Sequence, residues 1–324
     1  MPNGMLTLLD VVKQTGNQTA QGVIETVVMR VPEVRVVPTE VIDGTHYEAL
    51  VRTEIPDVGF RHVNEGTDPV KSGYDRQLSE CFLLDGLIKT DKANADAAGS
   101  RKAALMAREV MGIIWGAWRT VGRQFFYGRK ADKKGFFGLS ELVEKEMTIG
   151  NKSAGLSPNT GSSVYAVYLD TNEGVSFILG GQGTGILAPD VEWTKTLATD
   201  SGGKSYEAYY ANLQAWIGLR VLNPLSIAKY DNLTEQEGQM LDDRKLARLV
   251  DVFQEKSGGI RPSHLFMSYR SRSQLRDSRE IALYGIGKTR PDQPGVVPTP
   301  TEWEGIPIEV TDSLRKDEPI VPRT

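Results

Sequence analysis

The sequence predicts an α+β protein built around one long helix. Three observations support this fold class. Residues Gly99–Tyr127 carry an amphipathic helical pattern, residues 33–92 read as extended chain, and the residues that follow are rich in strand patterns. At about 1.5 Å per residue the helix is about 40 Å long, the length of a small domain. A helix of that length is expected to act as a rigid beam between the extended segment and the strand-rich half.

Composition bounds the classes of protein that the chain can belong to. The 324 residues are 40% hydrophobic and 25% charged, which is ordinary for a globular protein with about two lobes. The net charge of −4 excludes a uniformly basic nucleic-acid binder, so any contact with nucleic acid requires a local patch. The single cysteine, Cys81, excludes an intrachain disulfide and is interpreted as a half-buried apolar residue. No signal peptide and no apolar run of about 18 residues is apparent, so no membrane partner is expected.

The residues before the helix predict an arm and a hairpin. Residues 1–32 contain two short helical patterns, the second ending at Pro32, and these bury too little surface to be stable alone. Val34–Ile42 and Thr45–Thr53 flank Asp43-Gly44, a strong hairpin turn. After a polar loop, Tyr74–Leu84 resumes as a strand. Because the hairpin has few large apolar residues, we expect it to project from the body.

The long helix has two different faces, with Asn94 or Asp96 as the expected N-cap. The apolar face is expected to pack on a sheet. It comprises Ala103, Met106, Ala107, Val110, Ile113, Ile114, Ala117, Trp118, Val121 and Phe125.

The second half of the chain predicts strands with two helices. The strand patterns at Val164–Leu169 and Val175–Leu179 predict a hairpin. A third, at Leu213–Val221, alternates apolar and polar residues, and two more are present at His264–Tyr269 and Ile306–Val310. Helical patterns are present at Asp242–Glu255 and Ser271–Tyr284.

The sequence predicts no catalytic, cofactor or metal site. Gly183, Gly185 and Ala188, in the loop Gly180–Ala188, match the loose dinucleotide pattern G-x-G-x-x-A, but Pro189-Asp190 and a strand pattern follow where that pattern needs a helix. A loop between strands is therefore favoured, and a nucleotide-dependent enzyme is the alternative from another class. The three histidines, His46, His62 and His264, lack metal-ligand spacing.

The opposite face of the long helix carries an arginine stripe: Arg101, Arg108, Arg119 and Arg123. The first three fall within about 20° of one line on an ideal helix, and Arg123 within about 40°. Solvated helix faces usually mix both signs of charge, whereas this stripe is nearly all arginine with Trp115 beside it. Two functional interpretations stay open beside a solvated face: carboxylates of a neighbouring subunit, or phosphates of nucleic acid.

Three local sequences accompany this order of elements: WIGLRVLNPLSIAKYDNL at Trp216–Leu233, RPSHLFMSYRSRSQL at Arg261–Leu275 and WEGIPIEVTDSL at Trp303–Leu314. Together with the order of the elements, they resemble the major capsid proteins of tailed bacteriophages, most of all those of short-tailed phages. The resemblance implies the capsid fold shared by tailed phages and herpesviruses. It implies an N-terminal arm at 1–35, an extended hairpin loop at 36–92, a peripheral domain with the spine helix at 93–149 and 291–324, and a mixed α/β axial domain at 150–290.

The function implied by this resemblance is structural. The chain is expected to self-assemble into pentamers and hexamers of an icosahedral shell around double-stranded DNA, in the host cytoplasm, as part of the virion. Scaffolding, portal and decoration proteins are the further partners that the resemblance implies. A shell of a bacterial encapsulin-like compartment is the alternative within the fold. Some relatives join a loop lysine to an asparagine of a neighbour; Lys71 lies at the loop tip, but no matching asparagine is identified, so no cross-link is expected.

Overall fold

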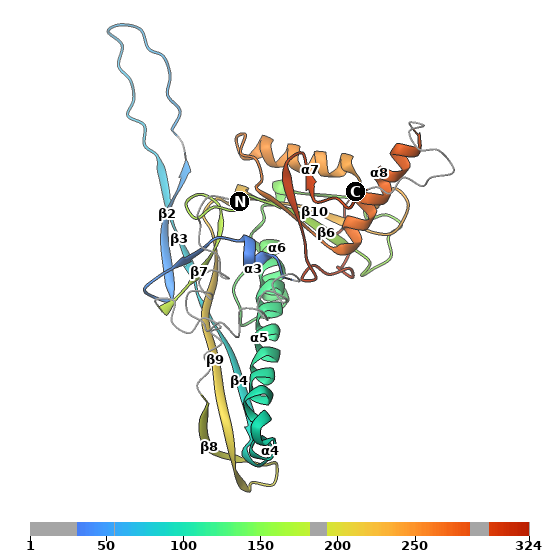
Figure 1. Ribbon diagram of the computed structural model, residues 1–324. Helices are drawn as coiled ribbons and strands as arrows, with labels where there is room; N and C mark the ends of the chain where they lie inside the picture. Colours follow the sequence, from blue (N-terminus) through green and yellow to red (C-terminus); the bar gives the residue numbers. More distant parts are fainter. Residues whose placement is uncertain (1–30, 55, 182–192, 286–297, 324) are drawn as a thin grey trace.

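The computed structural model describes residues 31–54, 56–181, 193–285 and 298–323. Figure 1 shows three parts: an elongated beam that contains α5, a globular lobe that carries α7 and α8, and a hairpin, β2–β3, that projects beyond both. The mixed α+β class predicted from the sequence is confirmed. Among the described residues, no helix combines the length and the apolar character needed to span a bilayer.

The beam is a five-stranded sheet with α5 (Lys102–Tyr127) packed along β4 (Figure 1). The strand order is β1-β7-β9-β4, with β8 paired to the far end of β9. The bounds are β1 Thr39–Val41, β4 Phe82–Asp91, β7 Val175–Leu179, β8 Thr194–Thr199 and β9 Ser205–Val221. The 17-residue strand β9 runs the length of the beam and pairs with three other strands, so it is the central strand of this sheet.

The lobe is a six-stranded sheet in the order β12-β13-β11-β6-β10-β5. The helix α7 (Asp243–Lys256) packs on β10 and β6 with an apolar side that contains Leu246, Leu249, Val250 and Phe253, and α8 (Tyr269–Gly285) packs beside α7. The strand bounds are β5 Thr148–Gly150, β6 Ser162–Val167, β10 Ile227–Leu233, β11 His264–Met267, β12 Glu302–Trp303 and β13 Ile306–Val310. Short helices link these parts: α3 Glu33–Val36, α4 Lys92–Ala97, α6 Leu139–Leu142, and the 3₁₀ turns Gly99–Arg101, Gly128–Lys130, Lys145–Met147 and Pro224–Ser226.

An aromatic cluster joins the beam to the lobe at the end of α5. The Phe125 ring lies 5.4 Å from Phe177 of the beam sheet and 5.9 Å from Phe266 of the lobe sheet, measured between centroids. Phe126 lies 5.5 Å from Tyr165 and 5.7 Å from Phe266. All five side chains are fully buried. The last turns of one helix are therefore part of the core of both sheets.

The projecting hairpin consists of β2 (His46–Glu54) and β3 (Gly73–Glu80), paired antiparallel from His46↔Glu80 outward. At its base the hairpin crosses the beam sheet over Gly218. A Cβ atom at Gly218 would overlap the Glu80 carbonyl oxygen and would lie 2.9 Å from the Ile178 side chain. The crossing therefore depends on a residue without a side chain at this point.

Several predicted elements are confirmed. The long helix is present as α5, extended by 3₁₀ turns at both ends; the alternating strand is β9; and the helices at 242–255 and 271–284 are α7 and α8. The predicted N-caps Asn94 and Asp96 are wrong, because a separate short helix, α4, precedes α5 and is capped by Asp91.

The two hairpins predicted from local turns are wrong. Val34–Val36 lies in the helix α3, and β1 pairs in parallel with β7 rather than returning into β2. The predicted partners at Val164–Leu169 and Val175–Leu179 form β6 and β7, which belong to different sheets. The predicted strand Tyr74–Leu84 is divided at Cys81 into β3 and β4. The predicted helices in the arm fall outside the described residues.

We predict that Gly218→Ala destabilises the subunit by about 1–3 kcal/mol, because the added methyl group must displace the crossing hairpin. Urea unfolding of dispersed subunits measures the change in free energy. The control is Gly112→Ala: the position of its Cβ on α5 is open, so this helical substitution is expected to stabilise by up to about 1 kcal/mol. A Gly218→Ala subunit as stable as the wild type would show that the hairpin does not press on the sheet there.

Candidate functional site

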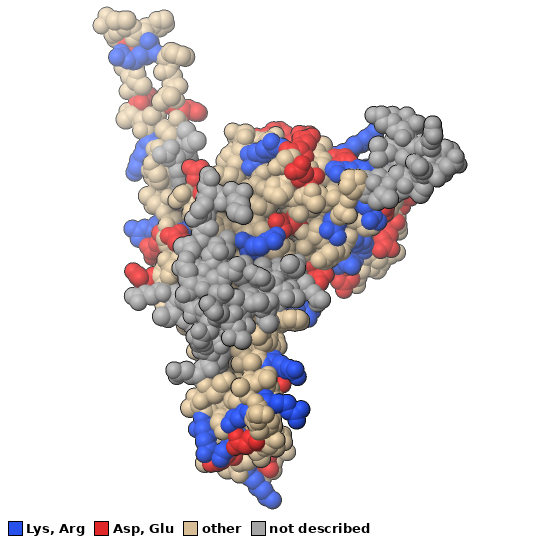
Figure 2. All heavy atoms as spheres, in the orientation of Figure 1, with Lys and Arg blue, Asp and Glu red and all other residues tan. Residues whose placement is uncertain are grey.

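The four arginines of the predicted stripe are all exposed: Arg108, Arg119 and Arg123 lie on α5, and Arg101 directly precedes it at the end of a 3₁₀ turn. Arg101, Arg108, Arg119 and Arg123 are exposed, and none of their side chains forms a hydrogen bond or ion pair with another residue of the described chain. Figure 2 shows basic side chains that project from the beam on the side that carries α5. The structure therefore places these cations together on one surface, without side-chain partners among the residues that it describes.

The buried side of α5 is a narrower seam than the sequence pattern predicts. Met106, Val110, Ile114, Trp118 and Val121 are buried against the beam. Ala103 and Ala107, which we expected on this side, are exposed. Ile113 and Ala117 are partly buried beside this row, so the face is covered along β4 but not at Ala103 and Ala107. Trp115 retains 39% of its surface exposed on the outer face.

The tip of the projecting hairpin exposes apolar side chains. Val58, Phe60, Val63 and Val70 are all exposed, and Phe60 is as accessible as in an unfolded chain. Figure 1 shows that this tip extends away from both the beam and the lobe. Exposed apolar groups gathered on one projecting element are typical of a protein-protein contact surface.

A buried arginine fixes the base of the hairpin. Arg220 of β9 is 1% exposed, forms an ion pair of 2.6 Å with Glu40, and donates from Nε to Ser176 Oγ at 3.1 Å. Its guanidinium lies 4.6 Å from the ring centroid of Tyr47, which belongs to β2. Gln77 of β3 adds a hydrogen bond of 2.8 Å to the Val221 carbonyl. The base of the hairpin is therefore bound to the sheet, whereas its tip is not.

A buried carboxyl group, Glu33, lies where α3, α5 and the C-terminal segment meet. Thr311 Oγ1 donates to Glu33 Oε1 at 2.8 Å, and Oε2 has no partner among the described residues. Burial raises the pKa of Glu33 to about 7, against the weaker opposing effect of its hydrogen bonds. Glu33 is therefore half protonated near neutral pH in the folded subunit.

An ion pair and a neutral histidine lie beside this junction. Arg35 pairs with Glu309 at 3.1 Å. Burial, with a smaller effect of the Arg35 charge, lowers the pKa of His264 to about 4, so this histidine is neutral at physiological pH.

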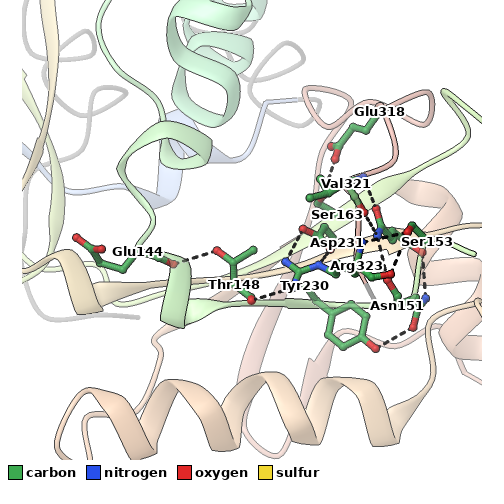
Figure 3. Close-up of polar contacts among 11 residues, drawn as sticks. Glu144, Thr148, Asn151, Ser153, Ser163, Tyr230, Asp231, Glu318, Val321 and Arg323 are labelled. Atoms are coloured by element: carbon green, nitrogen blue, oxygen red, sulfur yellow. Dashed lines mark hydrogen bonds and ion pairs between the residues drawn. The ribbon is translucent and has the colours of Figure 1, made fainter.

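The C-terminal segment is held on the lobe by a polar network (Figure 3). Arg323 binds both carboxylate oxygens of Asp231, at 2.7 and 2.9 Å, and the Asp231 side chain is only 3% exposed. Asn151 accepts a hydrogen bond from the Tyr230 hydroxyl at 2.9 Å. The Tyr127 hydroxyl, at the end of α5, donates to Glu318 at 2.6 Å. This network connects the chain terminus, the lobe sheet and α5.

The remaining sequence candidates show no chemical constellation among the described residues. Gly180 donates to the Trp216 carbonyl at 3.0 Å, and the next described element is the strand β8; residues 182–188 of the glycine-rich loop fall outside the description. Burial raises the pKa of the Cys81 thiol to about 11, so it is not a reactive thiolate. Within the described ranges, no group of residues has the composition of a metal site.

Sequence reasoning missed Arg220 and Glu33. Arg220 continues the polar, outward positions of β9 and reads as exposed, but Tyr47 of the crossing hairpin, together with Glu40 and Ser176, surrounds it. Glu33 lies between Pro32 and the predicted strand Val34–Ile42, where the sequence predicts extended chain. Neither residue has a local signal that would reveal its burial.

Comparison with known proteins gives consistent results. A family model described as "Major capsid protein GP7" matches residues 19–322. The structure is similar to a chain in the near-atomic resolution structure of bacteriophage Epsilon15, with a TM-score of 0.59 and 19% identity over 96% of each chain. It is also similar to a chain of the bacteriophage JBD30 capsid, with a TM-score of 0.51 and 12% identity over 88% of this chain and 91% of that one. No curated protein matches the sequence.

We predict that the wild-type subunit loses stability as the pH rises from 4.5 to 7, and that the Glu33→Gln variant does not show this loss. A carboxyl whose pKa rises from 4.5 to about 7 on folding makes folding less favourable as the pH increases through this range, by about 3 kcal/mol in total. Below pH 4.5 the residue is protonated in both states and contributes nothing to the pH dependence. The variant is therefore expected to be the more stable protein at pH 8.

Urea unfolding midpoints of wild type and variant at pH 5, 6, 7 and 8 test this prediction, because the contribution of His264 is common to both proteins. Glu304→Gln, at an exposed carboxyl, is the control and is expected to leave the pH dependence unchanged. A constant difference between wild type and Glu33→Gln at every pH would contradict the account of Glu33.

Proposed function

The chain belongs to the family of the major capsid protein GP7, and from this premise we propose that its copies assemble as pentamers and hexamers of an icosahedral shell around double-stranded DNA. Family membership makes the chain a structural protein of the phage capsid shell, and not an enzyme. It locates the chain in the virion. It also favours the phage shell over the compartment shell and over the nucleotide-dependent enzyme.

The observation that best supports self-assembly is the projecting hairpin. Its base is bound to the beam through Arg220, while Val58, Phe60, Val63 and Val70 are exposed at its tip. A two-stranded hairpin is marginally stable by itself in water. A neighbouring copy that covers the tip would remove this apolar surface from water, at about 25 cal/mol per Å². We therefore assign the hairpin tip to a contact between copies.

The division of the chain into domains is proposed from its resemblance to tailed-phage capsid proteins. We propose the arm at 1–35, the extended loop at 36–92, the peripheral domain at 93–149 and 291–324, and the axial domain at 150–290. The segment 150–290 contributes strands to both the beam sheet and the lobe sheet. The proposed axial and peripheral domains therefore meet where the beam joins the lobe. Assembly in the host cytoplasm and contacts with scaffolding, portal and decoration proteins belong to the same proposal.

The arginine stripe is proposed to face a partner of the shell subunit. Two partners fit four guanidinium groups that have no ion-pair partner in the described part of the chain: the phosphates of enclosed DNA, or carboxylates of another protein chain. A DNA contact would be independent of sequence and weakened by salt.

We predict that Phe60→Asp prevents assembly without unfolding the subunit. The substitution removes the largest apolar group of the hairpin tip and adds a charge that is costly to bury in a contact. Negative-stain electron microscopy and sedimentation of the purified chain measure assembly. The expected result is shells for the wild type and dispersed subunits for the variant, with unchanged circular dichroism.

The matched control is Thr67→Asp, which adds the same charge to the same exposed loop without removing apolar surface. It is expected to assemble. Shells formed equally well by Phe60→Asp would contradict the role of the tip, and a wild-type chain that stays dispersed under all conditions would contradict the proposed function itself.

A further inference from the structure

We propose that the exposed face of α5 docks an acidic amphipathic helix of a separate protein. This surface, called here the α5 face, consists of Arg101, which directly precedes α5, and of Ala104, Arg108, Gly112, Trp115, Arg119 and Arg123 on the helix itself. The proposal names the partner of the arginine stripe, and it rests on the proposed function only for the biological role of that partner.

The spacing of the α5 face fits a helical partner. Arg101, Arg108 and Trp115 recur at intervals of seven residues, and Arg119 follows one turn later. Seven residues make nearly two helical turns, so these side chains follow one line along the axis. A second helix that lies along this line presents its own side chains at the same interval and can pair with each of them in turn.

The charge of the α5 face requires an acidic partner. Its four arginines lack ion-pair partners among the described residues, and Glu109 is the single acidic residue of α5. A guanidinium group binds a carboxylate with two parallel hydrogen bonds. Carboxylates from one partner helix would therefore meet successive arginines.

Trp115 distinguishes a protein helix from DNA. Its exposed indole lies along the helix between Arg108 and Arg119. A DNA backbone presents phosphates and sugars along such a line, whereas an amphipathic helix presents an apolar side chain between its acidic ones. Apolar contact for the indole together with carboxylates for the arginines is the combination that such a helix supplies.

The surface also permits close approach. A Cβ atom at Gly112 or at Gly116 would have no heavy atom within 4 Å, so the backbone of α5 is accessible on this side. Helices pack with their axes about 8–10 Å apart when the side chains between them are small. A second copy of this chain is a poorer partner, because α7 exposes Arg244 and Arg248 together with Asp251. We therefore assign the docked helix to another protein.

The test uses dispersed full-length subunits and three fluorescent probes. One is a synthetic helix of about four heptads with leucine along one face and glutamate on either side of it. The second has the same composition in scrambled order. The third is a DNA duplex of about 20 base pairs, at fixed salt concentration. Fluorescence anisotropy gives the dissociation constant of each probe.

Two variants of α5 separate the two kinds of partner. The double variant Arg108→Gln/Arg119→Gln removes two positive charges. The variant Gly112→Leu places a bulky side chain between α5 and the docked helix, and because leucine favours a helix more than glycine does, the subunit stays folded. The wild type is expected to bind the heptad peptide more tightly than the scrambled peptide. Each variant is expected to weaken peptide binding by at least about tenfold. The control is Arg244→Gln/Arg248→Gln on α7, with unchanged affinity.

Three results would overturn the proposal: equal affinity for the two peptides, peptide binding that Gly112→Leu leaves unchanged, or duplex binding that is tighter than peptide binding and lost only with the arginines. The last result would assign the α5 face to DNA. Electron microscopy of the same proteins reports shell formation separately, so failure of docking is distinguishable from failure of the proposed function.

Discussion

The contact on which the structure depends is the packing of Phe125 and Phe126 between the two sheets. Their rings meet Phe177 of the beam, and Phe266 and Tyr165 of the lobe, with centroid separations between 5.4 and 5.9 Å. Aromatic pairs at these distances bury large apolar surfaces and fix ring orientation. Because both phenylalanines belong to the last turns of α5, the helix is rigidly connected to both sheets at one end. The hydrogen bond of Tyr127 to Glu318 extends this connection to the C-terminal segment.

The outer surfaces follow from how α5 is held. At its start Lys102 binds Asp96 of α4 and the Tyr209 hydroxyl of β9, and along its length α5 lies over β4, so one side is buried and the arginine-bearing face is left in solvent. The hairpin is fixed only at its base, where Gly218 and Arg220 admit and bind it, and its apolar tip is uncovered. A rigid centre with uncovered extensions is the form expected of a shell subunit, whose fold is completed by its neighbours. Ordering the extended loop costs about 1–2 kcal/mol per residue, which the loop alone does not recover.

The sequence predicted those parts of the fold that depend on local periodicity. The helix α5, the alternating strand β9 and the apolar side of α7 all follow from residue spacing, and so does the common face of the four arginines. The pairing of strands did not follow, because β1 pairs with β7 across more than a hundred residues, whereas the Asp43-Gly44 turn signals only a change of direction. Arg220 and Glu33 could not be recognised as buried, since the elements that cover them are distant in sequence. Ala103 and Ala107 fit an apolar face but are exposed, because the sheet beneath α5 does not extend under them.

The central claim is that the hairpin tip gains its order from neighbouring copies. Hydrogen exchange of dispersed subunits and of assembled shells tests it most directly, with the amides of residues 56–72 compared with those of β9. The account predicts that the tip exchanges at near-intrinsic rates in subunits and is strongly protected in shells, while β9 is protected in both states. Equal protection of residues 56–72 in the two states would contradict the claim, because the tip would then be stable without neighbours.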